Sequence, residues 1–94
     1  MKVLVAYDVC TSSEGGEKRL RQVARACKDY GQRVQKSLFE CMVGETDWVR
    51  LRGRLLHEMD AKQDSLLFYF LDADIRVEQH GTAQVVDPEA PLVI

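Results

Sequence analysis

Runs of apolar residues along the chain predict its strands. Residues 3–7 and 66–71 are almost continuously apolar, and such runs are typical of strands buried on both faces. Residues 33–43 also have strand character but exceed the length of an average strand, so we expect a bulge or tight turn near Lys36 and Ser37 to divide them. The tail offers one or two short strands, at about residues 76–80 and 82–86.

Two stretches carry apolar residues at helical spacing. The first predicts an amphipathic helix from Glu17 to Tyr30, with Gly31 as its C-cap. The second predicts a helix that Thr46 caps and that runs to about Asp60. The apolar residues of the second helix form one stripe: Trp48, Leu51, Leu55 and Met59.

The order of these elements predicts the fold class. Strand, helix, two strands, helix and strand make βαββαβ, an α+β ferredoxin-like plan with an extra C-terminal strand. We expect a single domain over residues 1–94, with its core in 1–74 and a strand and tail in 75–94. Two helices can cover only one face of the sheet, whereas the central strands look apolar on both faces. A second copy packed sheet to sheet about a two-fold axis would cover the other face, so we predict a homodimer.

Composition and charge are those of a soluble globular protein. Of 94 residues, 46% are hydrophobic and 30% charged, and no apolar run is long enough to span a membrane, so we expect a cytoplasmic protein. The net charge of −2 combines an excess of three positive charges in residues 1–40 with an excess of five negative charges in residues 41–94. Since the overall charge does not favour DNA, nucleic acid would have to bind at a local basic face.

The three cysteines do not indicate a zinc site. Cys10, Cys27 and Cys41 are widely separated, and no pair has the spacing of metal ligands. Buried thiols are the favoured interpretation. A catalytic cysteine comes second, because nothing in the sequence places a histidine beside one.

Asp8 is the first candidate for chemistry, because it directly follows a strand that we expect to be buried. A carboxylate there must be solvated, hydrogen-bonded or bound to metal. The simpler interpretation is a hydrogen bond to its own loop. If the strand end instead lies near the two-fold axis, Asp8 and its symmetry mate could bind Mg²⁺ or Mn²⁺, and such a metal could activate water for phosphodiester hydrolysis.

The first predicted helix has a basic side. Five positive charges lie within eleven positions: Lys18, Arg19, Arg21, Arg25 and Lys28. A charged helix face is usually only solvated surface, but this density of charge also suits contacts to phosphate. Three arginines of the second helix would add to it if they project the same way: Arg50, Arg52 and Arg54.

Three segments carry a family resemblance: Val3–Val9, Tyr30–Gly31 and above all Arg33–Cys41, which reads Arg-Val-Gln-Lys-Ser-Leu-Phe-Glu-Cys. In these segments the chain resembles the second of the CRISPR-associated core proteins, the small subunit of the spacer-acquisition machinery. The loop Thr11–Gly16 and the Asp-Pro-Glu-Ala-Pro-Leu tail are similar to the subgroup that accompanies type I-C systems.

The resemblance implies a homodimer in which the last strand of each chain completes the partner's sheet. It also implies that Asp8 and its mate form a site for Mg²⁺, with Mn²⁺ as the other possibility. The protein would then be a metal-dependent endonuclease of double-stranded DNA, single-stranded RNA or both. Four residues fall in or near substrate-binding positions of the family: Arg19, Arg21, Arg33 and Phe39. We add Arg25, from the basic side of the first helix, to the candidate nucleic-acid-binding residues.

The same family offers a second, architectural role. In that role the dimer bridges two dimers of the CRISPR integrase and supports protospacer DNA on its basic surfaces, with residues 92–94 docking on the integrase. Asp8 then need not be catalytic. A toxin-type endoribonuclease of the same fold is a third alternative.

Overall fold

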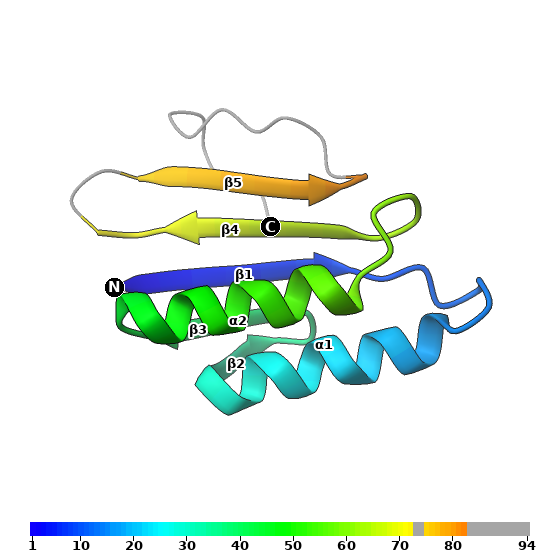
Figure 1. The fold of residues 1–94 in the computed structure, drawn as a ribbon, viewed down its shortest axis with the longest axis horizontal. Helices are drawn as coiled ribbons and strands as arrows, with labels where there is room; N and C mark the ends of the chain where they lie inside the picture. Colours follow the sequence, from blue (N-terminus) through cyan, green and yellow to red (C-terminus); the bar gives the residue numbers. More distant parts are fainter. Residues whose placement is uncertain (73–74, 83–94) are drawn as a thin grey trace.

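The fold is seen in a computed structural model, which describes residues 1–72 and 75–82 (Figure 1). These residues form five strands and two helices in the predicted order. The elements are β1 (Lys2–Asp8), α1 (Gly16–Tyr30), β2 (Gly31–Gln35), β3 (Leu38–Met42), α2 (Glu45–Glu58), β4 (Ser65–Phe70) and β5 (Arg76–Gly81). The strands make one sheet in the order β2-β3-β1-β4-β5, with every neighbouring pair antiparallel. The predicted α+β, ferredoxin-like plan with an added C-terminal strand is confirmed.

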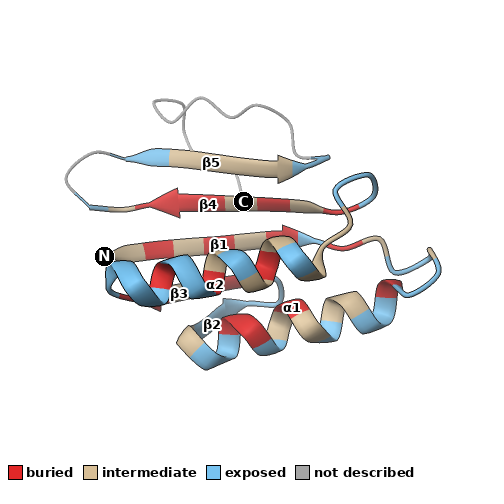
Figure 2. Ribbon diagram, in the orientation of Figure 1, coloured by how far each residue is buried: buried red, intermediate tan, exposed pale blue. Residues whose placement is uncertain are grey.

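Both helices cover the same face of the sheet, as Figure 1 shows. Along β1, Val3, Val5 and Tyr7 are buried in the core with residues of α1 and α2. Leu4 and Ala6 point to the opposite face and are only half-buried, which gives β1 its alternating colours in Figure 2. Within one chain, the apolar run is therefore fully buried on one face only. The face opposite the helices is called the open face below.

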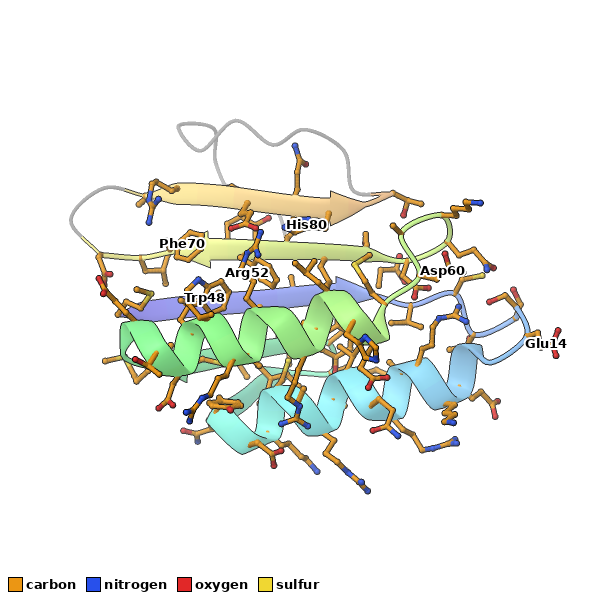
Figure 3. The ribbon with its side chains drawn as sticks, in the orientation of Figure 1. Glu14, Trp48, Arg52, Asp60, Phe70 and His80 are labelled. Carbon is orange, nitrogen blue, oxygen red and sulfur yellow. The ribbon has the colours of Figure 1, made fainter. Side chains whose placement is uncertain are left out.

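The apolar stripe of α2 packs against the sheet as predicted. Trp48, Leu51 and Leu55 are buried. The indole of Trp48 meets the rings of Phe68 and Phe70 edge-on, with centroids 4.9 and 5.3 Å apart. Figure 3 labels Trp48 and Phe70. Edge-to-face contacts at these distances are favourable for aromatic rings. They fix α2 over β4.

The start of the second helix departs from the prediction, whereas the end of the first agrees with it. The second helix begins at Glu45, with Gly44 as N-cap and no capping side chain, so the prediction that Thr46 caps it is wrong. The first helix ends at Tyr30 with Gly31 as its C-cap, as predicted, but Gly31 is extended (φ −159°), so α1 passes directly into β2 without a left-handed turn. Glycine is needed there for space, because a Cβ atom would lie 2.5 Å from Cys41 Sγ. The tight packing of β2 on β3 therefore explains this glycine.

The divided strand and part of the tail follow the prediction. A turn at Lys36 and Ser37 separates β2 from β3, and the register slips between Arg33 and Gln35. The predicted strand at 76–80 is β5, which pairs with β4. The predicted strand at 82–86 and the docking segment at 92–94 lie wholly or mostly outside the described residues. Neither helix of the described ranges is long and apolar enough to cross a membrane.

Two of the three cysteines belong to the core. Cys27 of α1 and Cys41 of β3 are fully buried, whereas Cys10 is half-buried. Burial raises the pKa of Cys27 to about 12 and that of Cys41 to about 11. Both therefore stay protonated at neutral pH, as expected of structural thiols.

Candidate functional site

Asp8 lies exposed at the end of β1. It is paired with Ser65 of β4, and strand alternation places it on the open face with Leu4 and Ala6. None of the hydrogen bonds or ion pairs formed between described residues uses its carboxylate. The simple interpretation, in which Asp8 only bonds its own loop, therefore has no support within the described residues.

A hollow of about 430 Å³ opens beside Asp8, between the first half of α1 and the β2–β3 turn. Its lining combines apolar, basic and hydroxyl side chains with the one carboxylate. The apolar part consists of Tyr7, Val9, Leu20 and Ala24. The polar part consists of Asp8, Thr11, Arg21, Arg33, Lys36 and Ser37. Three basic residues and one acidic residue thus line the hollow, a composition suited to a phosphate ester.

Arg33 is held in place by an aromatic stack. Its guanidinium carbon lies 5.1 Å from the centroid of the Phe39 ring, and that ring stacks on Tyr7 at 6.1 Å. Burial raises the pKa of Tyr7, and the nearby Arg33 partly offsets this effect. Phe39 itself is fully buried, so its ring is not accessible to a nucleic-acid base. In this structure Phe39 instead holds the Arg33 guanidinium through a cation–π contact.

The basic residues of α1 do not share one environment. Four of them are exposed and recur at helical spacing: Lys18, Arg21, Arg25 and Lys28. These four are called the basic stripe below. Arg19 instead turns inward, where its Nε donates to Asp64 Oδ2 at 2.9 Å and its Nη2 donates to Ser13 Oγ at 2.8 Å. Since these bonds occupy its guanidinium, Arg19 is not available to phosphate in this conformation.

Asp64 joins three segments of the chain. Its fully buried carboxylate accepts hydrogen bonds from Arg19 and from the backbone N–H groups of Cys10 and Asp60. Burial by itself would raise the pKa of Asp64. The hydrogen bonds from Arg19 and the two N–H groups outweigh burial, so the pKa of Asp64 lies below its ordinary value of 3.8. Asp64 thereby fixes the segment that begins two residues after Asp8. The sequence analysis missed this residue, and its only local sign is the polar turn from Asp60 to Asp64.

The arginines of α2 also have partners within the chain. Arg52 pairs with Glu78 of β5, with 2.7 Å between Nη2 and Oε2, and Figure 3 shows Arg52 pointing toward β5. Arg54 pairs with Asp29 of α1 at 2.8 Å. These two residues join secondary-structure elements, which leaves Arg50 as the member of the predicted set that is exposed.

The described part of one chain does not contain a complete metal site. Within residues 1–72 and 75–82, no three His, Cys, Asp or Glu side chains are grouped so that they could hold a metal ion. Asp8 contributes one carboxylate, and a divalent cation prefers several oxygen ligands. Within the described residues, a metal at Asp8 would have Asp8 as its one carboxylate ligand.

Comparison with known proteins agrees with the family resemblance. The family model described as CRISPR associated protein Cas2 matches residues 1–78. A protein of Nitratidesulfovibrio vulgaris named CRISPR-associated endoribonuclease Cas2 is 51% identical, over all of this chain and 94% of its own length. One of Halalkalibacterium halodurans named CRISPR-associated endonuclease Cas2 is 48% identical, over 99% of both chains.

A solved structure leads to the same conclusion. The crystal structure of Streptococcus pyogenes Cas2 at pH 6.5 has a TM-score of 0.70 and 54% sequence identity, over 76% of this chain and 86% of that one. The fold, the residues matched by the family model and the relatives that cover nearly the whole chain all point to the same family. The chain belongs to the CRISPR-associated protein Cas2 family.

Proposed function

We propose that the protein is an endonuclease of CRISPR adaptation that hydrolyses phosphodiester bonds at Asp8. The names of its relatives, endoribonuclease and endonuclease, support a nuclease. The observation that carries the proposal is the exposed Asp8 carboxylate at the edge of a basic hollow. The proposed substrates are double-stranded DNA, single-stranded RNA or both.

The proposed active form is a homodimer joined through the open faces. Leu4 and Ala6 lie half-buried on the same face as Asp8, and Leu67 of β4 is paired with Ala6. An apolar surface of this kind is suited to association with a second copy. A two-fold axis near the end of β1 would bring two Asp8 carboxylates together. We propose Mg²⁺, or Mn²⁺, as the ion that they hold, because hard divalent cations prefer carboxylate oxygens.

The residues of the hollow have separate proposed roles. Asp8 binds the ion, which when bound polarises the phosphodiester and lowers the pKa of water. Arg21, Arg33 and Lys36 bind and orient the phosphates on either side of the bond that is cut. The stack of Phe39 under Arg33 keeps that guanidinium in position.

Metal dependence is the first test of this function. Purified protein is incubated with labelled double-stranded DNA and single-stranded RNA in Mg²⁺, in EDTA, and in EDTA followed by excess Mg²⁺. We expect cleavage in Mg²⁺, none in EDTA and recovery after Mg²⁺ is restored, with the substrate that is cut identified in the same gel. Cleavage that continues in EDTA would contradict a metal-dependent mechanism.

The basic stripe favours the architectural role as a second candidate. Its four exposed cations lie along α1, and they could hold a nucleic-acid backbone whether or not Asp8 is catalytic. In this alternative the dimer bridges integrase dimers and supports protospacer DNA without cutting it. Wild-type protein that binds duplex DNA without cleaving it would favour this alternative.

Reversing charge on the basic stripe should weaken nucleic-acid binding in either role. For Arg21→Glu/Arg25→Glu we expect duplex affinity to fall at least about tenfold at moderate salt, and the dependence of affinity on salt to become shallower. Lys62→Glu/Arg76→Glu is the matched control, because it changes net charge equally at exposed positions away from α1. Fluorescence anisotropy across a salt series measures both effects. Equal losses in the two double variants would refute a specific role for the stripe.

A further inference from the structure

We propose that the hollow beside Asp8 receives one unpaired nucleotide of the substrate strand. This inference rests on the proposed function, because it names the form of nucleic acid that the same site accepts. The base would lie against the apolar wall formed by Leu20 and Ala24. Its phosphate would lie among the cations Arg21, Arg33 and Lys36.

The volume of the hollow suits one nucleotide. Small-molecule sites in proteins commonly occupy about 300–1,000 Å³, and this hollow lies near the lower limit at about 430 Å³. A base that remains stacked and paired in a duplex cannot enter such a space. Proteins that take up a single base therefore act on single strands, or they extrude the base from the helix at a cost in free energy for unstacking and unpairing.

The lining offers what an unpaired nucleotide needs. Leu20 and Ala24 of α1 are half-buried and give an apolar surface, while the exposed Arg21 projects beside them. Across the hollow, the Arg33 guanidinium is anchored by Phe39 on one side. A base in the hollow could stack on the plane of the Arg33 guanidinium. Such stacking accepts every base, because each base has a π-face.

The polar groups near the base do not select one base over another. Thr11 and Ser37 contribute hydroxyls, each of which can donate or accept a hydrogen bond. Such groups adapt to either kind of base edge. The hollow should therefore select an unpaired nucleotide without reading its sequence, so single strands and frayed duplex ends would enter the site, whereas intact duplex would bind only along the basic stripe.

The test fills the hollow without changing charge. Ala24→Leu extends a side chain into the space, and leucine suits a half-exposed helix position. Ala61→Leu, at an exposed position in the α2–β4 loop, adds the same atoms elsewhere. Both changes are made in the Asp8→Asn background and assayed without metal. Anisotropy then reports binding of a short single strand and of a blunt duplex of the same sequence.

We expect Ala24→Leu to weaken single-strand binding about tenfold, as for loss of one stacked base, and to leave duplex binding within about twofold. Ala61→Leu should change neither affinity. Unchanged single-strand binding in Ala24→Leu would overturn the proposal. So would an equal loss for both substrates.

A second measurement covers the case in which Ala24→Leu fails to fold. Methyl NMR spectra of the wild type are recorded during titration with thymidine 5′-monophosphate. The methyl signals of Leu20 and Ala24 should shift most, and shifts confined to other methyl groups would overturn the proposal. Since none of these experiments requires cleavage, the nucleotide subsite and the nuclease activity can fail independently.

Discussion

Replacing Asp8 with asparagine should lower metal-dependent cleavage at least about 100-fold, because the amide removes the negative charge proposed to hold the ion. Asparagine has nearly the same shape, and Asp8 is exposed, so the free energy of unfolding should change by no more than about 0.5 kcal/mol. Initial rates of cleavage in Mg²⁺ and a denaturant melt check the two effects. Asp47→Asn, an exposed aspartate at the start of α2, is the control and should cut like the wild type. Cleavage at the wild-type rate by Asp8→Asn would end the proposed catalytic role.

Mixing the two proteins tests whether both copies of Asp8 serve one site in the proposed dimer. If wild type and Asp8→Asn exchange subunits freely in equal amounts, about one quarter of the dimers keep two aspartates. Activity should then fall to about one quarter of that of an all-wild-type sample, since a mixed dimer has one carboxylate. A value near one half would indicate that each Asp8 works alone.

Replacing Asp64 with asparagine should destabilise the fold by about 3 kcal/mol, as when a buried ion pair loses one partner. The carboxylate of Asp64 is fully buried and accepts bonds from Arg19, Cys10 and Asp60. Asp29→Asn is the matched control, since it removes the exposed ion pair with Arg54. That change should cost at most about 1 kcal/mol. Urea melts of both variants give the comparison, and equal losses would contradict a special role for Asp64.

The effect of Asp64 should depend on pH with a definite sign. Because its pKa in the folded protein lies below the ordinary value of 3.8, the charged form stabilises the fold. This stabilisation is complete above the pKa of the unfolded chain and is lost as pH falls through the folded value. The stability gap between wild type and Asp64→Asn should therefore be constant near neutral pH and narrow below about pH 4. A gap that does not change down to acid pH would refute the assigned cause.

The strands could be predicted because their signals are local. The apolar runs of β1 and β4 stand out from their neighbours, and the turn at Lys36 and Ser37 follows from the limited length of a strand. The start of α2 could not be placed as well. Thr46 has the chemistry of a cap, but the chain becomes helical at Glu45 and takes Gly44 as its N-cap. A residue that can cap a helix does not by itself fix where the helix begins.

The candidate site was only partly visible in the sequence. Asp8 stands out because a lone carboxylate ends an apolar strand. Arg19 and Asp64 are 45 positions apart, so their pairing depends on how the loops come together and has no local pattern. The burial of Phe39 likewise follows from the pairing of β3 with β1 and β2, which puts its ring under Arg33. Charges and rings could be found from the sequence, but their partners could not.

The two core cysteines give the protein an internal reporter of unfolding. Only a thiolate reacts readily with alkylating reagents, and the thiols of Cys27 and Cys41 are both buried and protonated. The half-buried Cys10 should react in the native protein, with a pKa lowered by its hydrogen bond to Ser12. Cys27 and Cys41 should be labelled only after α1 separates from β3 and exposes their thiols. The rate at which the second and third labels appear in a mass spectrum therefore measures how often the core opens, with no probe added to the chain.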